Sequence, residues 1–92
     1  MKYQLQPTTK YRKDRKRLIK RGKDMSKLDA VIEKLANGEA LPSHNRDHVL
    51  VGNRKGYRDC HIEPDWVLIY KVDGDRLVLI LSETGSHADL LE

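Results

Sequence analysis

Histidine is the residue type in this chain best suited to acid–base chemistry. Four are present, His44, His48, His61 and His87, and the ordinary pKa of imidazole lies close to neutral pH. Cleavage of RNA by its own 2′-hydroxyl needs a base for the 2′ proton, an acid for the leaving 5′-oxygen, and a cation or donor that stabilises the phosphorane. A small basic protein with several histidines and a nearby acid could carry out this reaction without a metal.

Strand geometry places two candidate groups near each other. Residues 57–62 alternate as a half-buried strand does, with Cys60 and Ile62 on one face and His61 on the other. A turn at 63–65 leads into the next strand, so we expect His61 and Asp65 to lie close across it. The sequence alone does not determine whether His48 and His87 reach the same place.

Phosphate binding has three basic candidates. The planar guanidinium of Arg58 matches phosphate oxygens, but its i, i+3 spacing from His61 on one strand directs it to the opposite face. Lys55 and Arg46 are therefore alternatives for this role.

A metal or cofactor site is not expected. His44 and His48 have an i, i+4 spacing, but they lie in a loop whose only nearby acid is Asp47, which is a poor match to a zinc site. We interpret His44 as a loop residue. A chain of 92 residues has a thin core with little room for an enclosed cofactor, so we predict a shallow groove that a large partner completes.

Positive charge is concentrated between residues 10 and 23. This segment holds nine Lys or Arg and one acid, Asp14, and so carries +8, while the rest of the chain carries −4. Such a concentration indicates contact with nucleic-acid phosphates, although a solvated helix face is the alternative. The predicted contact residues are Lys10, Arg12, Lys13, Lys16, Arg17 and Lys20.

The hydrophobic pattern predicts a single α+β domain over residues 1–92. Helices are expected at 8–21, capped by Thr8 or Thr9, and at about 24–36, capped by Asp24 or Ser26. Strands are expected at 3–6, 57–62, 66–72 and 76–82, with a short one at 49–51, a turn at 84–86 and a helical turn at 87–91. This order implies a twisted, mostly antiparallel sheet with the helical hairpin on one face.

Cysteine content and hydropathy favour a cytoplasmic protein. The single Cys60 cannot form an internal disulfide, which fits a reducing compartment. The first residues have no apolar stretch of signal-peptide length. The longest apolar runs, 66–70 and 77–81, are too short to span a bilayer, so no membrane partner is expected.

A long motif resembles the YafQ branch of the RelE/ParE toxin superfamily. It runs Lys55-Gly56-Tyr57-Arg58-Asp59-x-His61-x-Glu63-Pro64-Asp65-Trp66-x-Leu68-Ile69-Tyr70, and Thr84-Gly85-Ser86-His87-Ala88 follows it. The upstream Asp47-His48 and the Lys-rich helical hairpin are also similar, so the resemblance covers essentially the whole chain. It implies a small RelE-like microbial RNase fold.

The resemblance also implies an activity and its residues. YafQ-like toxins are ribosome-dependent mRNA endonucleases of type II toxin–antitoxin systems, and they act in the ribosomal A site. Their acid–base set of three histidines and an aspartate corresponds to His48, His61, Asp65 and His87. An aromatic residue near the C-terminus positions the mRNA in that family, whereas this sequence has Leu91 there.

The same resemblance implies the partners. The basic hairpin would contact ribosomal RNA of the 70S ribosome, and an acidic antitoxin would wrap the toxin and supply a DNA-binding domain. The alternative is a non-enzymatic inhibitor of DNA gyrase, as in ParE-like toxins, which needs no acid–base cluster. A plain RNA- or DNA-binding module would explain the basic hairpin and leave the histidines unexplained.

Overall fold

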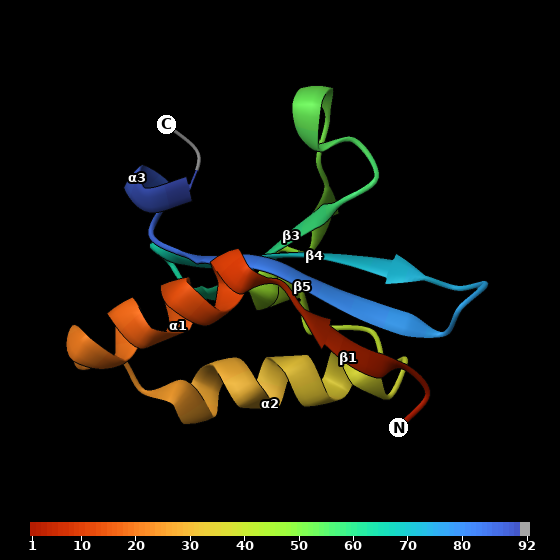
Figure 1. Cartoon of the computed structure of the whole chain (residues 1–92), viewed down its shortest axis with the longest axis horizontal. Helices are drawn as coiled ribbons and strands as arrows, with labels where there is room; N and C mark the ends of the chain where they lie inside the picture. The colour runs from red at the N-terminus through yellow and green to blue at the C-terminus, as the bar shows by residue number, and fades with distance from the viewer. Residues whose placement is uncertain (91–92) are drawn as a thin grey trace.

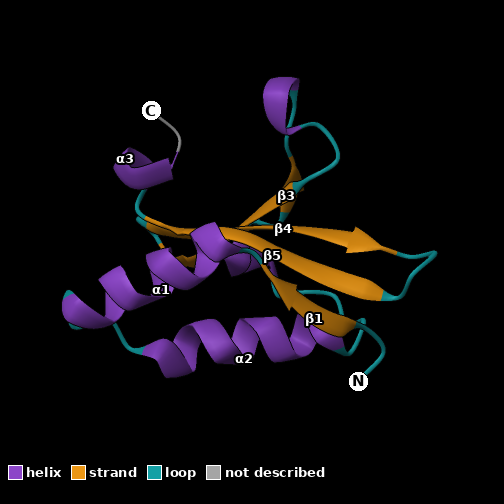
Figure 2. Cartoon of the chain, in the orientation of Figure 1, coloured by secondary structure: helices purple, strands orange, loops and turns teal. Residues whose placement is uncertain are grey.

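The computed structural model describes residues 1–90 as a five-stranded sheet with an α-helical hairpin on one face (Figure 1). The strands are β1 (Gln4–Pro7), β2 (His48–Val49), β3 (Arg58–Glu63), β4 (Trp66–Asp73) and β5 (Val78–Gly85). The helices are α1 (Thr9–Lys20), α2 (Met25–Ala36) and α3 (His87–Leu90), with 3-10 turns η1 (Ser43–Asn45) and η2 (Gly52–Arg54) (Figure 2). The predicted α+β fold is confirmed.

The sheet has the order β1-β5-β4-β3-β2. Strand β1 pairs in parallel with β5, and the other neighbours are antiparallel. Strand β1 lies one residue later than the expected 3–6, and Pro7, which lacks a backbone N–H, ends it at one edge of the sheet. Two single residues cap the helices: Thr8 accepts a hydrogen bond from Tyr11 N, and Asp24 accepts one from Ser26 N.

Strand β5 differs from the prediction. It begins two residues later than expected and continues through Gly85, so the turn predicted at 84–86 is wrong. The turn between β4 and β5 is longer than the three residues expected between 66–72 and 76–82. The Asp73 carboxylate accepts the N–H groups of Asp75 and Arg76 there, and Leu77 has a φ of 54°. At the other end Thr84 is fully buried and hydrogen-bonded, which keeps the chain in the sheet.

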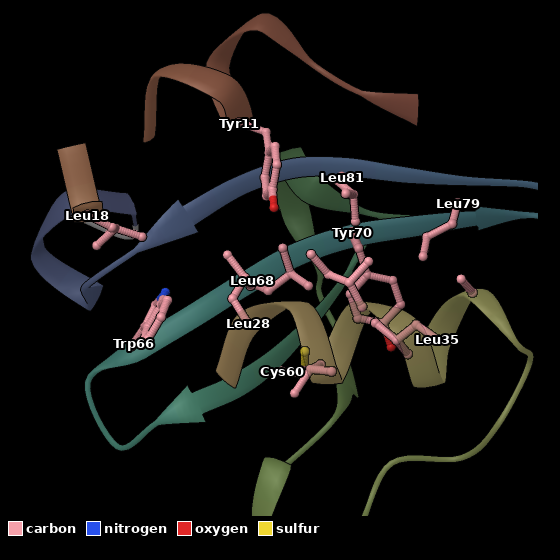
Figure 3. Packing of buried hydrophobic residues seen from close by; sticks show 13 residues of the cluster. Tyr11, Leu18, Leu28, Leu35, Cys60, Trp66, Leu68, Tyr70, Leu79 and Leu81 are labelled. Carbon is pink, nitrogen blue, oxygen red and sulfur yellow. The ribbon is translucent and has the colours of Figure 1, made fainter. Parts of the chain in front are cut away.

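The main core lies between the helical hairpin and one face of the sheet (Figure 3). Leu18 of α1 and Leu28 of α2 pack in the same cluster as Leu68 and Tyr70 of β4. Cys60 of β3 is completely buried there, and burial raises the pKa of its thiol. None of the helices within residues 1–90 is long and apolar enough to cross a membrane.

A smaller apolar cluster covers part of the opposite face. It contains Val67 and Ile69 of β4 and Leu90 of α3, with Leu50 and Tyr57 packed against it. Strand β4 is therefore buried on both faces. The face opposite the helical hairpin is covered in part, and α3 sits on the side away from α2 (Figure 1).

Asp14, the single acid of the basic segment, joins α1 to β5. Its side chain is 1% exposed, and its Oδ2 accepts a hydrogen bond from Thr84 N at 3.1 Å. Lys10 and Arg17 both pair with its Oδ1. A buried carboxylate with these partners is costly to remove, because the amide and the two cations lose their counterpart.

We therefore expect Asp14→Ala to lower the free energy of unfolding by about 3 kcal/mol, measured by urea denaturation. The matched control is Asp29→Ala, since the Asp29 side chain is 55% exposed and pairs with Arg15 on the surface. That variant should lose less than about 1 kcal/mol. Equal losses in the two variants would contradict an anchoring role for Asp14.

Candidate active site

The carboxylate of Asp59 lies under a group of histidines. In the β2–β3 register His48 is directly opposite Asp59, and His61 is two residues further along β3. Cross-strand partners and residues at i, i+2 share a face of a sheet, so the three side chains lie on the same side. The prediction that His61 lies on the face opposite Cys60 and Ile62 agrees with this arrangement, because Cys60 belongs to the main core and Ile62 packs against it.

Asp59 is almost completely enclosed. Its side chain is 3% exposed, and within residues 1–90 its Oδ1 has no hydrogen-bond donor. His61 Nε2 is 4.0 Å from that oxygen, which is too long for a hydrogen bond. Burial raises the pKa of the Asp59 carboxyl, and the charges of His48, His61 and His87 oppose that shift. All three imidazoles therefore lie within electrostatic reach of one buried acid.

His87 is held by Asp65. Asp65 Oδ1 accepts hydrogen bonds from His87 N at 3.0 Å and from His87 Nδ1 at 2.8 Å. These bonds lower the pKa of Asp65, so its carboxylate is ionised at neutral pH. Since a carboxylate only accepts, Nδ1 carries a proton and Nε2 is left for proton exchange. The ring centroids of His87 and His61 are 5.3 Å apart, so the imidazole that Asp65 holds lies next to that of His61.

His48 is held in the same tautomer by the backbone. Its Nδ1 lies 2.7 Å from the carbonyl oxygen of Arg46, which can only accept, so Nε2 is again the free nitrogen. Asp47, the residue before His48, points to the other face of the sheet, where its carboxylate accepts hydrogen bonds from Arg58 and Tyr70. The His48 ring is therefore held by the Arg46 carbonyl, and the chain that leads into β2 is held by Asp47.

The helix that begins with His87 is fixed by a second ion pair. Arg21 donates two hydrogen bonds to Asp89, at 2.7 and 3.1 Å, and Ser86 N donates another. The Arg21 guanidinium, followed by Ser86, lowers the pKa of Asp89. A Cβ at Gly85 would lie 2.9 Å from Asp89 Oδ2, so glycine permits this close approach. Arg21 of the basic segment thus helps to position His87.

The predicted phosphate-binding residues are dispersed. Arg58 pairs with Asp47 on the helix side of the sheet, as its strand position predicted, and does not reach the histidines. Arg46 lines a hollow together with His61. Lys55 is exposed at the end of η2, and Leu91 lies outside the described residues.

The basic segment divides into structural and unpaired cations. Lys10 and Arg17, two of the predicted contact residues, are paired with Asp14. The other four have no carboxylate partner among residues 1–90, and the helical period places them within about 100° of arc opposite the buried Tyr11 and Leu18. We call these four the basic face: Arg12, Lys13, Lys16 and Lys20.

Sequence reasoning missed Asp59. The signal was present, because the alternation that places His61 away from the core places Asp59 on the same face. A carboxylate two residues before a candidate histidine was therefore a candidate as well. Within residues 1–90 no three His, Cys, Asp or Glu side chains converge as a metal-binding group.

Known proteins resemble this chain along almost all of its length. The sequence model of the family described as bacterial toxin of type II toxin–antitoxin system, YafQ, matches residues 3–92. The mRNA interferase toxin YafQ of Escherichia coli K12 is 51% identical over 81 residues, which covers 87% of this chain and 86% of that protein.

Solved structures show the same similarity. YafQ from Escherichia coli BL21(DE3) superposes with a TM-score of 0.91 at 40% identity, covering 98% of this chain and 99% of that chain. A chain of the Escherichia coli DinJ–YafQ toxin–antitoxin complex has a TM-score of 0.89 at 42% identity, with full coverage of both chains. From its sequence and its fold, this chain belongs to the YafQ family of bacterial toxins of type II toxin–antitoxin systems.

Proposed function

We propose that this chain is an mRNA interferase, the toxin of a type II toxin–antitoxin pair, which cleaves mRNA in the ribosomal A site by general acid–base chemistry. The observation that carries the proposal is the group of three imidazoles around buried Asp59, with His87 oriented by Asp65. The name of the Escherichia coli relative, an mRNA interferase toxin, supports the activity. An inhibitor of DNA gyrase would have no use for such a group.

Two imidazoles with a free Nε2 suit proton transfer from the 2′-hydroxyl and to the 5′-oxygen of a scissile phosphate. His48 and His87 each present Nε2 while Nδ1 is occupied by a fixed acceptor. One imidazole removes the 2′ proton, and a second protonates the leaving 5′-oxygen, which releases a strand with a 5′-hydroxyl. His61 lies beside His87 and above Asp59, so a proton taken up by His61 places positive charge 4.0 Å from a carboxylate oxygen.

Asp59 acts in this mechanism as a positioning residue. Its Oδ1 lacks a donor in the described structure, and a protonated His61, with Nε2 at 4.0 Å, could supply one after a small movement. Such an ion pair would offset part of the cost of keeping the Asp59 carboxylate buried without a partner. Asp59 Oδ1 is therefore free to accept a hydrogen bond from His61 when that imidazole carries a proton during the reaction.

Two macromolecular partners follow from this function. The basic face of α1 contacts ribosomal RNA, and Arg46 and Lys55 bind mRNA phosphates, with Leu91 as an apolar contact. A cognate antitoxin, acidic and able to bind DNA, neutralises the toxin, as the DinJ–YafQ complex of Escherichia coli suggests. The site of action is the cytoplasm, where ribosomes and mRNA occur together.

Removal of either imidazole at the centre of the site should abolish most cleavage. We expect His61→Ala and His87→Ala to slow mRNA cleavage on programmed 70S ribosomes by about 10²–10⁴-fold, measured by toeprinting. Arg76→Ala, an exposed change in the β4–β5 turn, is the control. Wild-type rates in both histidine variants would refute the proposed site.

The Asp59→Asn variant should be more stable than the wild type but less active. Because burial raises the pKa of Asp59, the wild type loses stability as the pH rises through that pKa, and the neutral variant should not. At pH 7 we expect the variant to be more stable by about 1 kcal/mol, or roughly 4–8 °C in Tm, by thermal denaturation.

The same variant should cleave more slowly on the ribosome. Its kcat should fall while its KM for programmed ribosomes stays near the wild-type value, because Asp59 lies buried behind the histidines and not on the exposed surface. Asp59→Glu keeps the negative charge and should retain more of the wild-type kcat. An Asn variant with the wild-type kcat would show that Asp59 is only a structural residue.

Charge reversal on the basic face should weaken ribosome binding. For Lys13→Glu/Lys16→Glu we expect a higher Kd for 70S ribosomes and a slope of log affinity against log salt that is smaller by about two. Lys2→Glu/Arg76→Glu makes the same change of charge away from α1 and serves as the control. Identical salt slopes for the two double variants would argue against the basic face as the ribosomal contact.

A further inference from the structure

A groove extends from His61 towards α2. Its first part is a hollow of about 310 Å³ lined by His44, Arg46, His61, Ile62, Glu63 and Pro64. A second hollow of about 320 Å³ has His44 and Ile62 in common with the first, so the two meet at these residues. Lys27 and Lys34 of α2 line the far part. The groove therefore has His61, a proposed catalytic residue, at one end and two lysines at the other.

The wall of the groove that carries His44 is held in place by the fold. The buried side chain of Asn45 donates a hydrogen bond from Nδ2 to the His61 carbonyl oxygen at 2.7 Å, which ties η1 to β3. Arg46 then adopts a left-handed conformation with a φ of 48°, which is uncommon for a residue other than glycine. His44 is thus presented from a segment attached to the same strand as His61.

The charges along the groove suit a polyanion. Within the described chain, Glu63 is the single acidic residue that lines either hollow. Lys23 and Lys27 each pair with it at 2.9 Å, and these contacts lower its pKa. With Glu63 neutralised in this way, Arg46 and Lys34 leave the groove positive.

We propose that this groove binds a nucleotide of the mRNA next to the scissile phosphate, with His44 stacking on the base and Lys34 pairing with the backbone phosphate beyond it. The inference rests on the proposed function and adds a subsite to it. Bases of single-stranded RNA stack on aromatic rings, and the adjoining Ile62 and Pro64 give the hollow an apolar floor. His44, which the sequence presents as a loop residue, becomes a determinant of which sites are cleaved.

The test measures cleavage on 70S ribosomes programmed with mRNAs that differ in the nucleotides flanking one A-site codon. We expect His44→Ala to raise KM about tenfold, to leave kcat within about twofold, and to reduce the preference among flanking bases. His44→Tyr retains a ring and should retain that preference. Lys34→Ala should raise KM without altering the preference, and Arg76→Ala should behave as the wild type.

Failure of the subsite and failure of the function give different results. If His61→Ala is inactive while His44→Ala keeps the wild-type KM and cleavage pattern, the subsite is refuted and the function stands. If His61→Ala cleaves at the wild-type rate, the proposed function itself is wrong. If His44→Ala cleaves normally but binds the cognate antitoxin more weakly, the groove belongs to the antitoxin and the proposal is overturned.

Discussion

The two faces of strand β3 separate the residues that hold the protein together from those that we propose carry out its chemistry. Cys60 points into the core beneath the helical hairpin and Ile62 packs against the edge of that core, while Asp59 and His61 point to the other side. Strand β4 can support both faces because it is buried on both. A shift of one residue in the β3–β4 register would exchange these faces, placing a carboxylate and an imidazole in the core. The β3–β4 register that buries the core therefore also places Asp59 and His61 on the side of the histidine group.

Acidic residues act as structural ties in a chain with a net charge of +4. Asp14 joins α1 to β5, Asp47 joins the His48 segment to β3 and β4, and Asp89 joins α3 to the end of α1. Each tie uses one or two of the abundant cations as a partner. Since the paired arginines and lysines are held against the fold, the charge left for a nucleic-acid partner is smaller and more localised than the composition suggests.

The sequence predicts the elements of this fold well and the side-chain partnerships less well. Alternation and capping residues located the strands and the helical hairpin, because burial periodicity and local hydrogen bonds determine both. The end of β5 was misplaced, since Thr84 stays in the sheet through contacts with Trp66 and Asp14 that are distant in sequence. The Asp65–His87 bond joins residues 22 positions apart, and only the folded sheet brings them together. The resemblance to YafQ-like toxins supplied the four catalytic candidates, whose roles rest on the proposed function.

The burial of Cys60 determines how its thiol responds to oxidants and alkylating agents. Its thiol is completely buried, and the pKa of that thiol is raised by burial, so the reactive thiolate is suppressed. Oxidants and alkylating agents reach such a cysteine only when the fold opens. Since it is the single cysteine of the chain, the folded protein has no accessible thiol through which peroxide or disulfide exchange could switch it off. Thiol oxidation is therefore not a route by which the folded protein could be regulated.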